Sequence, residues 1–201
     1  MNDLTLQNSI DENLRPVKVA GQNSALEIST ENARVNGSLE VAGDVTMPVR
    51  AGDIIGYTSV GSDSGHASES LTTSYAVVDA DLKVDFIVPP SGCVEVMVQI
   101  YQNSLSSNKS LYLALSSDSS YTSIGNSYEQ LVSYPDETDD GVIVNHWVVK
   151  GLTVNRPTTY WLGAKTSGTT KYLAWGGTAS NRYCDFIMKV TALPSNLITL
   201  G

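Results

Sequence analysis

A strict alternation of residue type between Ala33 and Met47, in the stretch ARVNGSLEVAGDVTM, is the strongest constraint on how this chain can fold. Every odd position holds an apolar residue or glycine: Ala33, Val35, Gly37, Leu39, Val41, Gly43, Val45 and Met47. A period of two predicts extended chain with one apolar face and one polar face. At roughly 3.3 Å per residue the segment could reach about 50 Å, which is long for one strand. Turns at Asn36-Gly37 and Ala42-Gly43 could divide it.

The apolar face of such a strand must be covered, because an isolated hairpin is only marginally stable in water. The strand can pack on the downstream part of its own chain, or identical strands of several subunits can meet at a symmetry axis. Gly37 and Gly43 favour the second arrangement, since small residues relieve crowding where chains converge. The alternative is an ordinary hairpin that turns at Asn36-Gly37. We therefore expect an oligomer interface formed by Val35, Gly37, Leu39, Val41, Gly43, Val45 and Met47.

Composition and charge exclude several classes of protein. The 201 residues are 41% hydrophobic and 16% charged, which is typical of a globular protein. A net charge of -9 without any Lys/Arg cluster argues against binding to nucleic acid or to an anionic membrane surface. No apolar run approaches the length of a spanning helix, and the N-terminus lacks the pattern of a signal peptide. We expect a protein that is made in a cytoplasm, is not exported by a recognisable signal and does not insert into a membrane.

Three regions differ in composition. Residues 1–24 carry scattered apolar residues in a polar context and are predicted to be an N-terminal anchor arm, too thin to fold alone. Residues 25–50 contain the alternating stretch and are predicted to be a β stem. Residues 51–201 hold short alternating segments separated by Ser, Gly, Asn and Thr-rich loops, and are predicted to be the head domain.

Within the head, the segments Leu82–Val88 and Val94–Ile100 alternate on either side of a Pro-Pro-Ser-Gly turn, which predicts a hairpin-like pair. Further strands are predicted over 110–115, 141–149, 159–164, 171–175 and 183–192. No helical period is evident. This spacing predicts an all-β fold, an antiparallel β-sandwich or jelly roll.

The segment PVKVAGQNSALEISTENARVNGSLEVAGDV resembles the N-terminal segments of structural proteins from tailed bacteriophages, marine ones especially. In those proteins a phrase of the type P-x-K-V-x-G-x-x-x-x-L-E-I leads into a V-x-G-x-L-x-V-x-G-x-V repeat, and a β-rich head follows. The resemblance covers about 35 residues, from Pro16 to Met47. The remaining part is similar in style to the jelly-roll heads of trimeric fibres and to complement C1q and tumour-necrosis-factor domains, without a diagnostic motif.

This resemblance implies a virion protein that is trimeric, binds phage capsid or tail proteins through its N-terminal arm, and displays a β-sandwich head outward. Only one repeat block occurs, which fits a short head fibre or a capsid decoration (cement) protein better than a long tail-fibre shaft. The alternative is a tail-fibre head that binds a receptor or a host surface glycan. A depolymerase is a more distant third alternative, because such enzymes usually need a larger grooved platform.

No motif for catalysis is complete. The acidic run 136–140 lacks the glutamate of a calcium loop, because Trp147 stands at the twelfth position. The segment 61–66, GSDSGH, does not follow the G-x-S-x-G order of a nucleophile elbow. Cys93 and Cys184 are expected to be small buried hydrophobic residues rather than a pair, and they are too few for zinc. We expect no enzyme, no cofactor and no metal site, although a calcium site of another geometry at 136–140 and a spatial pair among Asp79, Asp81, Asp85 and Glu95 stay open.

The three tryptophans are the candidate ligand-binding residues, since an exposed indole can stack on a sugar ring. Trp147 shares the parity of Ile143 and Val149 and is expected in the core, whereas Trp161 lies opposite in parity to its apolar neighbours and is expected to face outward. Trp175 precedes Gly176-Gly177 and is expected at a strand end next to a loop. Trp161 and Trp175 are therefore the predicted contacts for a glycan.

Overall fold

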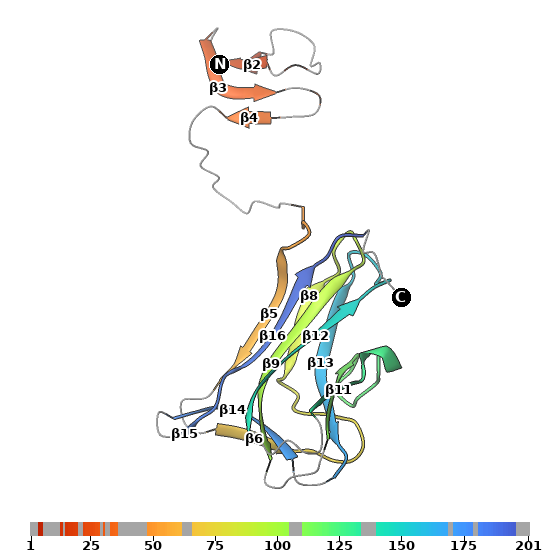
Figure 1. Ribbon diagram of the computed structural model, residues 1–201. Helices are drawn as coiled ribbons and strands as arrows, with labels where there is room; N and C mark the ends of the chain where they lie inside the picture. Colours follow the sequence, from red (N-terminus) through yellow and green to blue (C-terminus); the bar gives the residue numbers. More distant parts are fainter. Residues whose placement is uncertain are drawn as a thin grey trace. The chain divides into compact units, whose positions relative to one another are not determined.

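The computed structural model describes residues 4–5, 13, 15–19, 22–28, 30, 33–35, 48–61, 66–104, 110–133, 140–168, 171–178 and 181–195. The chain divides into two compact units, Met1–Met47 and Pro48–Gly201. Strands make up nearly all of the regular structure in the described part, together with one short 3-10 helix, Asn126–Tyr128. The expectation of an all-β fold is confirmed (Figure 1).

The first unit is a small antiparallel sheet in the order β1-β2-β3-β4. Its strands are β1 (Leu4–Thr5), β2 (Arg15–Val19), β3 (Gln22–Ile28) and β4 (Ala33–Val35). Val17 is buried, and Arg34 on β4 binds the carboxylate of Glu27, its cross-strand neighbour on β3, with Nε 2.8 Å from Oε2. Opposite charges that face each other across two strands stabilise that register.

This sheet differs from the predicted division of the N-terminal region. The boundary expected between residues 24 and 25 falls inside β3, so arm and stem share one sheet. Of the predicted interface residues, Val35 is half-buried and pairs with Leu26 of the same chain. Gly37, Leu39, Val41, Gly43, Val45 and Met47 lie outside the described residues, and the predicted subunit interface stays a prediction.

The second unit consists of two antiparallel sheets. One contains β5 (Ile54–Val60), β16 (Phe186–Ala192), β9 (Val94–Ser104) and β12 (Gly141–Val149), side by side in that order in Figure 1. The other contains β8 (Lys83–Ile87), β13 (Pro157–Thr166), β10 (Leu111–Ser116) and β11 (Gln130–Ser133). Shorter strands extend them: β14 (Lys171–Thr178) pairs with β9 and β6 (His66–Ser70), β15 (Asn181–Arg182) with β14, and β7 (Ala76–Val77) with β13.

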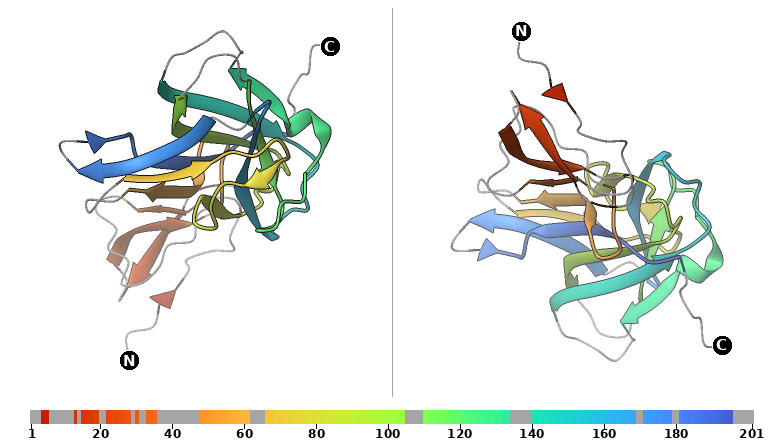
Figure 2. Two further views of the ribbon diagram at one scale, coloured as in Figure 1. Left: turned by 90° about the horizontal axis from the view of Figure 1, so that it is seen from below. Right: turned by 90° about the horizontal axis from the view of Figure 1, so that it is seen from above.

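The eight principal strands pair in a nested order. The first pairs with the last (β5 with β16), the second with the seventh (β8 with β13), the third with the sixth (β9 with β12) and the fourth with the fifth (β10 with β11). A long antiparallel ribbon rolled onto itself produces this order, which is the connectivity of a jelly roll. Figure 2 shows the same strands from below and from above. The second unit is therefore a jelly roll.

The inner faces of the two sheets form one hydrophobic core. On β9 the even-numbered residues Val94, Val96, Val98 and Ile100 are fully buried, while the odd-numbered ones between them are half-buried. Trp147 on β12 is 1% exposed, and its indole Nε1 donates a hydrogen bond to the carbonyl oxygen of Tyr128 at 2.9 Å. Trp147 is a core residue, as its parity predicted.

The predicted hairpin of 82–88 and 94–100 is wrong. Both segments are strands, but β8 pairs with β13 in one sheet and β9 pairs with strands of the other. The turn at 89–92 carries the chain from one sheet to the other across the edge of the sandwich. A period of two identifies the buried face of each strand, and that face is the same whether two strands lie beside each other or face each other across a core.

Candidate functional site

The outer face of β13 carries polar, charged and aromatic side chains. Its inward residues Tyr160, Leu162, Ala164 and Thr166 are buried, so the residues between them point away from the core. These outward residues are Pro157, Thr159, Trp161, Gly163 and Lys165. The neighbouring strands β8 and β10 place further polar and aromatic groups beside them. We call this row the β13 stripe.

Trp161 lies at the centre of the β13 stripe and is half-buried. Its cross-strand neighbour on β8 is Lys83, whose ammonium nitrogen lies 5.7 Å from the centroid of the indole. A cation at this distance over a tryptophan ring is attracted to its π face. The indole Nε1 is buried and has no hydrogen-bond partner within the described part of the chain. The prediction that Trp161 points outward from the core is confirmed by the strand geometry.

Three tyrosines continue the stripe toward the C-terminal end of β13. Tyr75 and Tyr121 stack with their centroids 5.3 Å apart and their planes 9° from parallel. The ammonium of Lys165 lies 4.3 Å from the centroid of Tyr75 and 5.0 Å from that of Tyr112. This arrangement holds Lys165 between two rings, where the cation contributes to both contacts.

Gly163 explains how Tyr121 lies so close to the sheet. A Cβ atom at this position would be 2.5 Å from Cε2 of Tyr121, so a larger residue would push the ring away. Tyr121 has a left-handed backbone (φ 68°), and its hydroxyl donates a hydrogen bond to Oε1 of Glu129 at 3.0 Å. The segment around Tyr121 thus folds back over the sheet as a cover for small residues of the strands beneath.

Burial raises the pKa values of Tyr75 and Tyr121. It raises the pKa of Tyr75 from 10.0 to about 12, and the nearby Glu129 carboxylate adds to the shift. Burial also raises the pKa of Tyr121, and the hydrogen bond to Glu129 reinforces it because it requires the protonated phenol. Both hydroxyl groups are therefore neutral at physiological pH.

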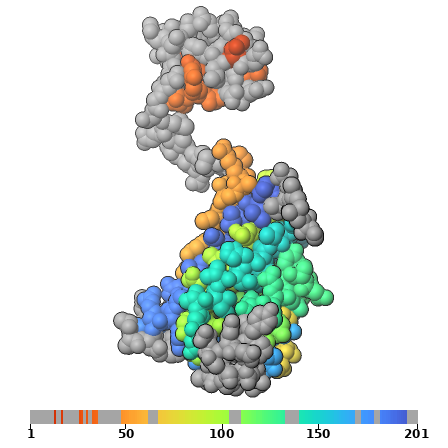
Figure 3. Space-filling model, in the orientation of Figure 1, coloured from red at the N-terminus to blue at the C-terminus, as the bar shows by residue number. Residues whose placement is uncertain are grey.

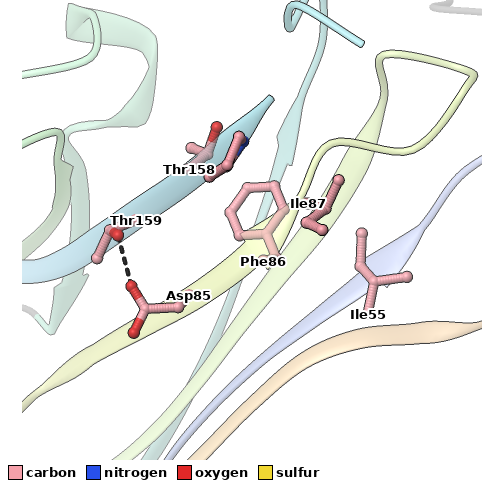
Figure 4. A pocket seen from close by; sticks show the side chains of 7 residues that line it. Ile55, Asp85, Phe86, Ile87, Thr158 and Thr159 are labelled. Carbon is pink, nitrogen blue, oxygen red and sulfur yellow. Dashed lines mark hydrogen bonds between the residues drawn. The ribbon is translucent and has the colours of Figure 1, made fainter. Parts of the chain in front are cut away.

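A shallow hollow of about 440 Å³ adjoins the other end of the stripe (Figure 4). It is lined by Ile55, Asp85, Phe86, Ile87, Pro157, Thr158 and Thr159. The Thr159 hydroxyl donates a hydrogen bond to Oδ1 of Asp85 at 2.5 Å, which leaves the second carboxylate oxygen as an acceptor at the wall. A mainly apolar hollow with a carboxylate and hydroxyl groups resembles the general make-up of small-ligand sites.

The structure separates Asp85 from Glu95, two of the carboxylates that could have formed a catalytic pair. Asp85 lies on the outer face of one sheet, whereas Glu95 lies on the outer face of the other and contacts His146 at 3.2 Å. Asp79 accepts a hydrogen bond from the backbone N–H of Asp81 in a loop. Within the described ranges no group of three or more His, Cys, Asp or Glu could hold a metal ion.

Other predicted features have mixed outcomes. Cys93 is buried, as expected, whereas Cys184 is half-buried, and both are free thiols. Burial raises the pKa of Cys184, with Asp185 adding to the shift. Most of the acidic run 136–140 and of the segment 61–66 lies outside the described residues. In the part of the chain that the structure describes, no helix is long and apolar enough to cross a membrane.

Trp175 does not lie at the strand end that the sequence predicted. Strand β14 continues to Thr178, and Trp175 is 4% exposed within the core cluster. The glycines that follow it adopt positive φ values, 67° at Gly176 and 124° at Gly177, and pass the chain toward β15. A ring so deeply buried offers no face to a sugar in this structure, which leaves Trp161 as the tryptophan at the surface.

Comparisons with known proteins give similarity in fold. No protein-family model matches the chain, and no curated protein sequence matches it. Solved structures of infectious bursal disease virus are similar. The VP2 subviral particle has a TM-score of 0.43 at 10% identity over 81% of this chain and 39% of that chain. The structure of the Gt strain has a TM-score of 0.44 at 12% identity, over 81% of this chain and 39% of that chain. The chain thus spans about two fifths of the length of these proteins, and no function is inferred from the likeness.

Proposed function

We propose that this protein is a structural component of a virion, of the capsid decoration or short head-fibre type, that assembles as a homotrimer through residues 25–50. The observation that carries the proposal is the division of the chain at Met47–Pro48. The segment that resembles phage structural proteins ends at this boundary, and a jelly roll follows. Jelly rolls are common in capsid proteins, although a fold alone does not fix a function.

In this proposal residues 1–24 attach the protein to capsid or tail proteins, and the jelly roll is displayed outward. The proposed role requires no catalytic chemistry. Association of three copies would cover the apolar face that the alternation predicts for the stem.

The stem is tested by replacing Leu39 and Val41 with Asp in the full chain. Charge on the apolar face should prevent association there, while the jelly roll stays folded because its core lies in the other unit. Light scattering should report one third of the mass per particle, with an unchanged near-ultraviolet circular dichroism spectrum. A stem variant that keeps the wild-type mass would refute the trimer.

The virion location has its own test. An antibody raised against the second unit should label particles of the parent virus in negative-stain electron microscopy, at regular positions on the capsid or the tail. Particles that contain the packaged genome but carry no label and no peptide of this chain by mass spectrometry would refute a structural role.

A second candidate function is binding of a neutral glycan on the β13 stripe. The half-buried ring of Trp161 beside the Asp85–Thr159 pair and the adjoining hollow favours it. An aromatic ring supplies apolar contact for a sugar face, and the carboxylate and hydroxyl groups offer hydrogen bonds to sugar hydroxyls. Glycan recognition and a structural role are compatible in one virion protein.

Glycan binding is tested on a glycan array with the full chain and two variants. Trp161→Ala should abolish binding, whereas Tyr57→Ala, which removes a 57% exposed ring from the other sheet, should keep it. Binding that survives Trp161→Ala, or an absence of any bound glycan on a broad array, would exclude this function without affecting the structural proposal.

A further inference from the structure

Strand β12 forms an exposed edge of its sheet. It pairs along its whole length with β9, without a register shift, and β9 is its one strand partner among the described residues. Natural proteins protect edge strands with proline, lysine, bulges or short length. The nine residues of β12, GVIVNHWVV, contain no proline and no lysine. An edge of this kind is suited to pairing with another strand.

The opposite edge of the same sheet is protected. The pairing of β5 with β16 contains a register shift near Val190 and Thr191, and β5 carries Gly56 in its middle. An irregularity and a glycine both disfavour a further strand on that side. On the second sheet, the edge strands β11 and β8 have four and five residues. Among the described edges, β12 is therefore the long and regular one.

The outward side chains of β12 are apolar and exposed. Val142 is 53% exposed, Val144 52% and Val148 45%, and the only titratable side chain on the strand is His146. In Figure 3 the teal atoms of this strand lie on the surface of the unit. Exposed apolar residues at alternate positions of one strand indicate a surface that another molecule covers.

The flanking charges identify the partner. Asp140 precedes β12 and Lys150 follows it. Both are exposed, and each also has a contact within its own chain. When the strand is laid antiparallel to a copy of itself about Asn145, Asp140 faces Lys150 of the copy at both ends. The same register places Val142 opposite Val148 and Val144 opposite His146. A two-fold interface requires such self-complementarity. When one residue of the first copy contacts a second residue of the other copy, the same contact recurs with the two copies exchanged.

We propose that β12 pairs with β12 of a second copy of this chain, antiparallel and centred on Asn145, to form one continuous sheet through two jelly rolls. The chain has a net charge of -9, so copies repel each other over most approaches. Strand β12 itself contains no Asp or Glu, so two copies that meet along it bring no carboxylates of this strand together. Combined with the trimeric stem, this contact would join two trimers into a hexamer.

A charge-swap series on the full chain tests the register. Lys150→Asp places two carboxylates opposite each other at both ends and should weaken pairing roughly tenfold. Adding Asp140→Lys restores opposite charges in swapped positions and should recover the wild-type dissociation constant, measured by analytical ultracentrifugation at low salt. A double variant no tighter than Lys150→Asp would overturn the register.

Val144→Lys tests the edge itself, because it places two ammonium groups near the proposed axis. It should halve the particle mass, both in the wild-type background and in the Leu39→Asp, Val41→Asp background. The matched control Ile54→Lys, at a 60% exposed position on β5, should leave the mass unchanged. A mass that Val144→Lys does not change, or that Ile54→Lys halves, would refute pairing through β12. The stem variant removes the stem contact and leaves β12 unchanged. The proposed β12 contact can therefore be refuted while the stem contact is retained, and the reverse.

Discussion

The two sheets of the jelly roll have inner faces of the same kind and outer faces of different kinds. On β13 the outward side chains are engaged with neighbours, as in the pairs Trp161 with Lys83 and Thr159 with Asp85. On β12 the outward valines are exposed and one imidazole contacts Glu95. The inner faces are alike because burial in one core requires apolar residues on both. The outer faces are free to differ, and their difference points to separate roles.

A substitution in the core that the two sheets share should have the largest effect on stability. Trp147→Ala removes the largest fully buried side chain and leaves the Tyr128 carbonyl without its donor. We expect a loss of about 3–5 kcal/mol in the free energy of unfolding, measured by urea denaturation. Trp161→Ala on the outer face is the matched control and should cost far less. Equal losses at the two tryptophans would contradict the distinction between inner and outer faces.

A smaller loss is expected where β5 packs closely against β8. Gly56 on β5 faces β8, and a Cβ atom there would be 2.8 Å from the carbonyl oxygen of Asp85 and 3.1 Å from Cβ of Phe86. Because backbone must move to make room, Gly56→Ala should destabilise the protein by about 1–3 kcal/mol, measured by thermal unfolding. Gly141→Ala, where no atom lies within 4 Å, is the control that should stay near wild type.

The smallest effect on stability is expected at Tyr75, beside the β13 stripe, and it depends on pH. The pKa of Tyr75 is about 12 in the folded protein against 10.0 as its ordinary value. Unfolded chains therefore lose this proton first, and stability present below pH 10 is lost as the pH rises from 10 to 12. Tyr75→Phe should reduce that loss, measured as the change in melting temperature over this interval. An equal loss in the variant would contradict the burial of this phenol.

Alternation in the sequence predicts much of the fold. The strand predicted over 141–149 coincides with β12, and those predicted over 110–115 and 159–164 overlap β10 and β13. These strands alternate because one face is buried. Strand β5 was not predicted, since the consecutive residues Ile54 and Ile55 break the period, and its pairing with β16 has a register shift at the same place. Strand β6 (HASES) is polar and carries little signal.

The pairing of strands and most of the β13 stripe could not be read from the sequence. The buried faces of β8 and β9 look the same for a hairpin and for a crossing between sheets, so the pairing depended on the rest of the chain. Trp161 was predicted to face outward from its parity. Tyr75 and Tyr121 come from loops, which have no period, and their stacking depends on Gly163, whose role appears only when the strands are in place.

Hydrogen–deuterium exchange of the full chain at two protein concentrations tests the central claim, that the β12 edge meets a second copy and the outer face of β13 remains open. The concentrations should lie tenfold above and tenfold below the dissociation constant of the β12 contact. Backbone amides of 141–149 should exchange more slowly at the higher concentration, while those of 54–60 and of 157–166 stay the same. Exchange of 141–149 that does not depend on concentration, or protection that shifts to 157–166, would contradict the account.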